Sequence, residues 1–99
     1  MIDLISKIYI DLNELVIRKV PHDKEILSTR IIKEHTKICE YCFNIKSSNK
    51  DKNYMLEFKV SIKYILFILN YFISKKLINN DIYKIIEKEY KDLYYIINP

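Results

Sequence analysis

Residues 55–72 read MLEFKVSIKYILFILNYF, and this stretch decides the fold. At about 100° per residue it forms a helix that carries two apolar stripes on nearly opposite sides. The first stripe consists of Met55, Phe58, Ile62, Ile65, Leu69 and Phe72. The second stripe consists of Leu56, Val60, Tyr64, Phe67 and Tyr71. One stripe is enough to fill the core of a helical bundle, so the second stripe needs a separate cover.

The second stripe predicts a subunit interface, because exposed stripes rich in aromatic residues mark contacts between proteins. The alternative is that neighbouring helices of the same chain curl around it. The interface hypothesis predicts an oligomer larger than a dimer, which a single charge at Phe67 or Tyr64 should disrupt.

Helical spacing continues through the rest of the chain and predicts four helices, at about 3–19, 23–45, 53–76 and 81–97. Pro21 ends the first helix, because the residue before a proline is pushed out of the helical region. We expect Asp23 to cap the second helix, and Asn79 or Asn80 to cap the fourth. The predicted core faces are Ile5, Ile8, Leu12 and Leu15 in the first helix, Ile31, Ile38, Cys42 and Ile45 in the second, and Ile82, Ile86, Leu93 and Ile97 in the fourth.

The polar run SSNKDKN at 47–53 is the clearest break between helices. The other connections are short, so helices that are neighbours in sequence should pack antiparallel. The prediction is an all-α, antiparallel, up-down-up-down four-helix bundle that forms a single domain over residues 1–99. Two long hairpins that exchange between chains are the alternative.

Composition excludes several classes of protein. Gly is absent, so the chain has no phosphate-binding loop, dinucleotide fingerprint or nucleophile elbow. No arrangement of catalytic residues stands out, so we expect neither an enzyme nor a cofactor. The acids Glu34, Glu40, Glu57, Glu87 and Glu89 are interpreted as solvated charges on helix surfaces. The longest apolar run, 64–72, is about half of the ~20 residues that a membrane span needs, which predicts a soluble, cytoplasmic protein without a membrane partner.

Cys39 and Cys42 form a Cys-x-x-Cys pair, with His35 one helical turn earlier. A redox pair needs its first cysteine at a helix N-terminus, and this pair lies deep inside the second helix. A structural zinc site needs about four ligands, and only three lie together here. We therefore expect buried thiols beside a histidine and no metal. A small metal site at these three residues remains the alternative.

Basic residues form rows on the outward faces of the helices, in a chain of net charge +4. Such rows can follow a nucleic-acid backbone through its phosphates, although an ordinary solvated face would look the same. No aromatic residue interleaves with the rows on the second and fourth helices, so recognition of shape and charge is expected rather than base stacking. The candidate nucleic-acid-binding residues are Arg30, Lys33 and Lys37 in the second helix, Lys52, Lys59 and Lys63 around the third, and Lys84, Lys88 and Lys91 in the fourth.

Two short motifs are similar to those of a known family. RKVPHDKE at 18–25 is similar to that family's Phe-Pro followed by a charged run. KLINNDIY at 76–83 is similar to its Leu/Phe-Ile-Ser-x-x-x-Tyr entry into the fourth helix. With the Ser/Asn/Lys-rich loop and the apolar third helix, the chain resembles the four-helix bundle family that includes Avd, the accessory variability protein of diversity-generating retroelements. The same family includes the proteins encoded by intervening sequences of 23S ribosomal RNA genes.

The resemblance to Avd implies a barrel-shaped homopentamer that binds a reverse transcriptase and its template RNA. It also implies support of error-prone cDNA synthesis without catalytic activity of its own. Avd-type members usually carry two arginines one turn apart in the third helix, where this chain has Leu66 and Asn70. The nucleic-acid face is therefore expected on lysines. The alternative is an oligomeric protein-interaction bundle of the intervening-sequence type, with no nucleic-acid contact.

Overall fold

The computed structural model describes residues 1–44 and 52–98, except for the side chains of 52–54. This part of the chain forms four α-helices and no strand, so the predicted all-α fold is confirmed. The helices are α1 (Ile2–Arg18), α2 (Glu25–Asn44), α3 (Lys52–Ser74) and α4 (Asn80–Ile97). Residues 47–51 of the predicted loop at 47–53 and the predicted core residue Ile45 lie outside the described residues. Lys52 and Asn53, the last two residues of that predicted loop, belong to α3 instead.

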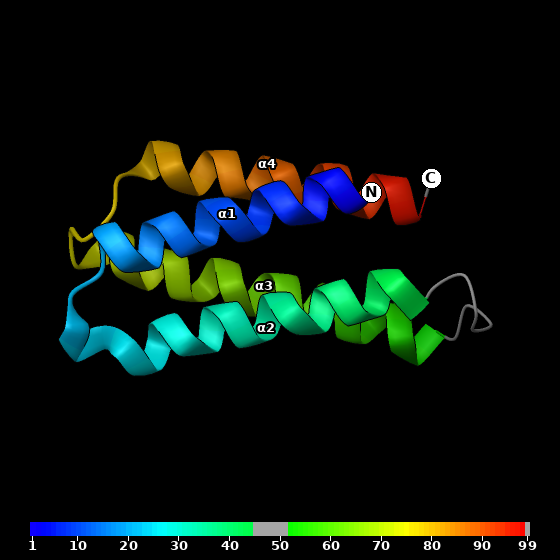
Figure 1. Cartoon of the computed structure of the whole chain (residues 1–99), viewed down its shortest axis with the longest axis horizontal. Coiled ribbons are helices and arrows are strands. Elements are labelled where there is room, and N and C mark those ends of the chain that lie inside the picture. Colours follow the sequence, from blue (N-terminus) through cyan, green and yellow to red (C-terminus); the bar gives the residue numbers. More distant parts are fainter. Residues whose placement is uncertain (45–51, 99) are drawn as a thin grey trace.

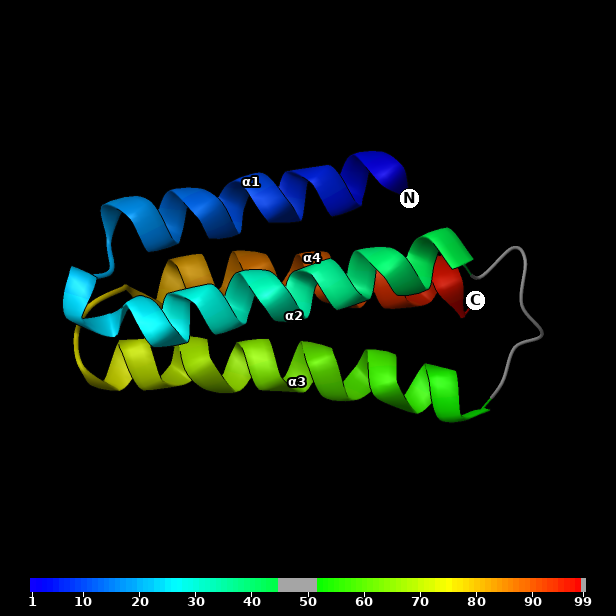
Figure 2. The same cartoon turned by 60° about the horizontal axis from the view of Figure 1, so that its bottom comes forward.

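The helices form a four-membered ring in which α1 packs on α2, α2 on α3, α3 on α4, and α4 back on α1. Each helix runs back along the one before it (Figures 1 and 2). Helices α1 and α3 lie across the bundle from each other, as do α2 and α4. The described helices of one chain thus close the bundle.

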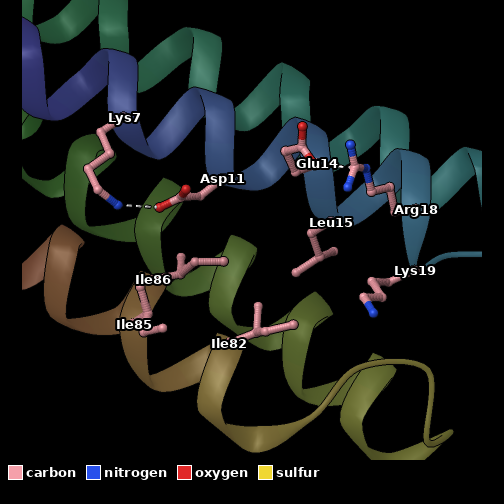
Figure 3. A pocket seen from close by; sticks show the side chains of 9 residues that line it. All are labelled: Lys7, Asp11, Glu14, Leu15, Arg18, Lys19, Ile82, Ile85 and Ile86. Carbon is pink, nitrogen blue, oxygen red and sulfur yellow. Dashed lines mark hydrogen bonds and ion pairs between the residues drawn. The ribbon is translucent and has the colours of Figure 1, made fainter.

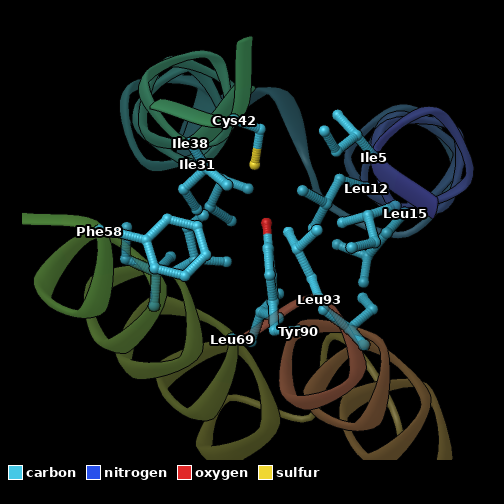
Figure 4. Packing of buried hydrophobic residues seen from close by; sticks show 14 of the residues in the cluster. Ile5, Leu12, Leu15, Ile31, Ile38, Cys42, Phe58, Leu69, Tyr90 and Leu93 are labelled. Atoms are coloured by element: carbon cyan, nitrogen blue, oxygen red, sulfur yellow. The ribbon is translucent and has the colours of Figure 1, made fainter. Parts of the chain in front are cut away.

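The core lies along the central axis, where the predicted faces of all four helices meet (Figure 4). Ile8, Leu12, Ile31, Leu69 and Leu93 have no exposed surface. The predicted core residues of α1 are all buried, and so are most of those of α2, α3 and α4; Met55, Ile62 and Ile82 are half-buried at the edge of the core.

The connection between α3 and α4 is fixed by hydrogen bonds at both helix ends. At the end of α3, Leu77 N–H donates to the Phe72 carbonyl and Lys76 N–H to the Ile73 carbonyl, each at 2.9 Å. This Schellman motif requires a left-handed residue, and Lys76 takes that place with φ 59°. The Asn79 side chain then accepts a hydrogen bond from Ile82 N–H at 3.0 Å, which confirms the predicted cap of α4.

The predicted Asp23 cap of the second helix is wrong. Asp23 lies inside a short 3₁₀ turn, η1 (His22–Lys24), and α2 begins after it at Glu25. The turn forms because Pro21 is extended, with ψ 155°, and its carbonyl accepts from Lys24 N–H at 3.0 Å. The turn connects α1 to α2 through this corner.

Candidate functional site

The second stripe of α3 faces outward along the described part of the bundle. The exposed fractions are 59% for Leu56, 53% for Val60 and 71% for Phe67, while Tyr64 is exposed to 39%. Tyr71 is half-buried, because it packs against the core cluster. Neighbouring helices therefore do not curl around the stripe, and a row of large apolar side chains remains on the surface.

The basic cluster of α2 is built around a buried carboxylate. Arg30 Nε and Lys37 Nζ both donate to Glu34 Oε1, at 3.0 and 3.3 Å, and the Glu34 residue is only 4% exposed. Burial on its own raises the pKa of Glu34. Hydrogen bonds from Ser61 and Lys37 and the two positive charges outweigh burial and hold that pKa below its usual value. The interpretation of Glu34 as a solvated charge is therefore wrong, because α3 covers it.

Arg30 also connects this cluster to the exposed stripe. Its guanidinium lies over the ring of Tyr64, 4.8 Å from the ring centroid. Lys33 is exposed on α2 and lies near Val16 of α1, and it has no ion-pair partner in the described residues. Of the three predicted contacts on α2, Lys33 is thus the one whose charge stays uncompensated.

The lysines of α4 are exposed as predicted, but two of them have acidic partners one turn away. Lys88 Nζ lies 3.4 Å from Asp92, and Lys91 Nζ lies 3.9 Å from Glu87. Because α2 and α4 lie across the bundle from each other, the structure does not bring this row together with the cluster of α2. The Lys52 side chain lies outside the described part of the chain.

Helices α3 and α4 instead bring lysines from two predicted groups together in one groove, which we name the α3–α4 groove. Its volume is about 420 Å³, and its lining includes Lys59, Lys63, Lys91, Tyr94 and Tyr95. The floor is formed by apolar side chains that include the half-buried Ile62 and Leu66. Leu66 is part of this floor, and the groove's charge comes from the lysines around it.

Aromatic rings do lie beside these lysines. On α4, Tyr94 and Tyr95 line the groove together with Lys91, so the expectation that no aromatic residue accompanies the row of the fourth helix is wrong. The Lys59 ammonium lies 5.2 Å from the Tyr94 ring centroid, and a hydrogen bond from Lys59 lowers the pKa of Tyr94, with Asn98 adding to the effect. Tyr95 meets Tyr94 edge to face, with ring centroids 6.1 Å apart. Tyr94 and Tyr95 follow Lys91 by three and four residues, a spacing that places them on one side of a helix and would have revealed this arrangement.

His35 is completely buried and joins three helices. Its Nε2 donates to the Ile5 carbonyl of α1 at 3.2 Å, because a carbonyl can only accept. Its Nδ1 is therefore unprotonated and accepts from the Tyr90 hydroxyl of α4 at 2.8 Å. Burial lowers the pKa of His35, with the Ile5 carbonyl acting in the opposite direction. Both ring nitrogens are occupied, which leaves neither for a metal ion.

Of the two thiols predicted to be buried, Cys42 is buried and Cys39 is only half-buried. Cys42 is buried in the core, and burial raises the pKa of its thiol to about 12. Cys39 is half-buried, and burial raises its pKa as well. Raised pKa values keep both side chains as neutral thiols, which are poor nucleophiles and poor ligands. Within residues 1–44 and 52–98, no group of three or more His, Cys, Asp or Glu side chains is arranged to hold a metal ion.

A second buried carboxylate lies between α1 and α4. Lys7 Nζ bridges Asp11, at 2.9 Å, and Glu89, at 3.0 Å, and the remaining oxygen of Glu89 has no donor among the described residues. Burial raises the pKa of Glu89, and so does the neighbouring Asp11 carboxylate, to which a protonated Glu89 can donate; Lys7 opposes both effects. The interpretation of Glu89 as solvated is therefore also wrong.

Lys7 and Asp11 sit at one end of a groove of about 360 Å³ between α1 and α4 (Figure 3). Glu14 and Arg18 form a 2.9 Å ion pair along the same edge. The opposite wall is apolar and comes from the isoleucines of α4, including the exposed Ile85. Two ion pairs balance four of the charges in this lining, and Lys19 leaves a single positive charge.

None of the helices in the described residues is long and apolar enough to cross a membrane. Comparison with known protein families, with curated proteins and with solved structures found no match. The resemblance to the Avd and intervening-sequence family therefore stays a prediction.

Proposed function

We propose that this protein is a non-catalytic, self-associating bundle that binds RNA. The observation that carries the proposal is the position of the exposed α3 stripe between two groups of basic side chains. On the α2 side, Arg30 stacks on Tyr64 and shares the Glu34 carboxylate with Lys37. On the α4 side, Lys59 and Lys63 adjoin the stripe and face the α3–α4 groove.

Self-association is supported by the apolar surface that the α3 stripe exposes to water. Covering a Leu, Val or Phe side chain stabilises a complex by roughly 1.5–3 kcal/mol each, before the entropy of association is subtracted. Phe67 and Leu56 are both more than half exposed in the single chain. A second copy that covers the stripe would remove this surface from water.

RNA binding is supported by the increase in positive charge that self-association would produce on one assembly. Each chain contributes a formal net charge of only +4. Copies joined along α3 bring their flanking lysines side by side, which concentrates a positive field on one assembly. Phosphate contacts from several chains then add up, and each contact releases counterions.

The partner that we propose is a reverse transcriptase with its template RNA, and the assembly a homopentamer, as the resemblance to Avd implies. The second candidate is a protein-interaction bundle without RNA. One observation favours this alternative: Arg30 and Lys37 share the Glu34 carboxylate, which reduces the charge that α2 offers to phosphates.

The experiment is a filter-binding titration of labelled RNA over a range of salt concentrations. Replacing Lys33 and Lys63 by Gln should lower the slope of log affinity against log salt by roughly 1.4–1.8, since each lost phosphate contact contributes about 0.7–0.9. Lys19→Gln, an exposed lysine of the α1–α2 corner, is the matched control and should change neither slope nor affinity. An absence of RNA affinity in the parent at ~0.05 M salt would leave the protein-only bundle. Co-elution with a co-expressed reverse transcriptase encoded beside this gene would support the accessory role.

A further inference from the structure

The α3–α4 groove combines the two features that single-stranded nucleic acid requires. It is large enough for a small ligand, because its volume of about 420 Å³ falls within the roughly 300–1,000 Å³ of binding pockets. Three lysine side chains, Lys59, Lys63 and Lys91, converge on it from two helices, and the acid in its lining is Glu87. The ammonium groups therefore outnumber the carboxylate, so the groove attracts an anion.

Tyr95 supplies the second feature, an open aromatic face. Its residue is 67% exposed, and its ring meets Tyr94 at an interplanar angle of 70°. The contact with Tyr94 orients the Tyr95 ring, and the large exposed fraction of Tyr95 leaves aromatic surface open to solvent. The Tyr94 ring, in contrast, already holds the Lys59 ammonium at 5.2 Å. A planar ligand group would therefore stack on Tyr95.

We propose that the α3–α4 groove binds a single RNA strand, with one base stacked on Tyr95 and the flanking phosphates on Lys63 and Lys91. Stacking on aromatic side chains combined with a basic groove is how proteins hold unpaired strands without reading their sequence. A duplex is a poorer ligand for this groove, because its bases stack on each other and cannot reach the ring. This inference rests on the proposed RNA binding and specifies its site and the form of the RNA.

Fluorescence anisotropy with two labelled probes tests this inference: a 12-nucleotide oligo(U) strand and a 12-base-pair RNA duplex. The parent should bind the single strand more tightly than the duplex. Tyr95→Leu should weaken single-strand binding by roughly 5- to 150-fold, which corresponds to the loss of one stacked base, and leave duplex binding unchanged. Tyr95→Phe keeps the ring and should bind like the parent.

Two further variants control for unspecific effects. Tyr9→Leu removes an exposed tyrosine of α1, outside the groove, and should leave both affinities unchanged. Lys63→Gln combined with Lys91→Gln should lower the salt slope for the single strand by about 1.4, because the single-strand value is roughly 0.7 per phosphate contact. Circular dichroism melts establish that each variant folds, as expected for exposed positions.

Other results would contradict either the groove site alone or the proposed RNA binding as well. Binding of oligo(U) that Tyr95→Leu leaves unchanged would overturn the groove site and leave the proposed RNA binding intact. Equal affinity for strand and duplex would do the same. Failure of the parent to bind either probe would overturn both proposals. If free uridine monophosphate bound as tightly as oligo(U), the groove would be a pocket for a single nucleotide. That result would overturn the proposal that the groove binds an RNA strand.

Discussion

The Tyr90 hydroxyl donates a hydrogen bond to Nδ1 of His35, 2.8 Å away, in the interior of the bundle. The relationship is directional, because the Ile5 carbonyl fixes the imidazole proton on Nε2. It joins α4, α2 and α1 through one neutral network, in a core that is otherwise built mainly from apolar side chains.

Tyr90→Phe should therefore lower the free energy of unfolding by about 1–3 kcal/mol, because it leaves Nδ1 of His35 buried without a donor. Urea denaturation followed by circular dichroism measures this change. Tyr9→Phe is the matched control, since Tyr9 is partly exposed and phenylalanine keeps its ring contact with His35, and it should stay within about 0.5 kcal/mol of the parent. A Tyr90→Phe protein as stable as the parent would mean that the network contributes nothing to stability.

Arg30→Met and Lys33→Met form a second pair of variants. Arg30 donates to the buried Glu34 and stacks on Tyr64, so its loss should destabilise the fold by about 1–3 kcal/mol. Lys33 extends into solvent, and its replacement should change stability by less than about 0.5 kcal/mol. Equal effects in urea denaturation would contradict the role of Glu34 as a buried anchor. Charge reversal of the whole cluster is consequently a poor test of RNA binding, because it would also weaken the fold.

Glu89→Gln should change how stability depends on pH. Since the folded-state pKa of Glu89 is raised, the folded protein holds that proton more tightly than the unfolded chain, and the parent loses stability as pH rises from about 4.3 through the folded-state pKa. Gln resembles the protonated acid and removes this loss. The variant should therefore gain stability relative to the parent between pH 4 and pH 8, measured by thermal melts at both values. If the difference in stability between variant and parent were the same at pH 4 and pH 8, the pKa of Glu89 would not be raised in the folded protein.

Lys76→Gly should stabilise the protein by about 1 kcal/mol. Lys76 ends α3 in the left-handed region, which costs a residue with a Cβ roughly 1–2 kcal/mol and costs glycine little. Part of this gain is lost because glycine also makes the unfolded chain more flexible. Lys75→Gly, one position earlier in the same turn, should not stabilise. Chemical denaturation that shows no gain at position 76 would argue against the Schellman end of α3.

The fold follows from the sequence because the spacing of apolar residues along each helix is a local property. The stripe of Ile5, Ile8, Leu12 and Leu15 is visible in the residue order, and all four side chains are buried. The second stripe of α3 is visible for the same reason, including the exposed Phe67.

The predictions that failed for the candidate site depend on contacts between helices, which the sequence of one helix does not show. Glu34 and Glu89 look like surface charges on their own helices, but α3 covers the first and α1 the second. The α3–α4 groove combines Lys63 of one helix with Lys91 and Tyr95 of another, which a helix-by-helix treatment separates. The left-handed conformation of Lys76 could not be predicted, because glycine, which usually marks such a helix end, is absent from the chain.

Sedimentation velocity of the parent protein mixed with labelled oligo(U) tests the central proposal most directly, because it reports assembly and RNA binding together. We expect the label to sediment with a protein species larger than a dimer of the 12.1 kDa chain. Phe67→Glu should dissociate that species and release most of the label, while the helical signal of the protein persists. A parent protein that sediments as a monomer with the label free in solution would contradict the proposal.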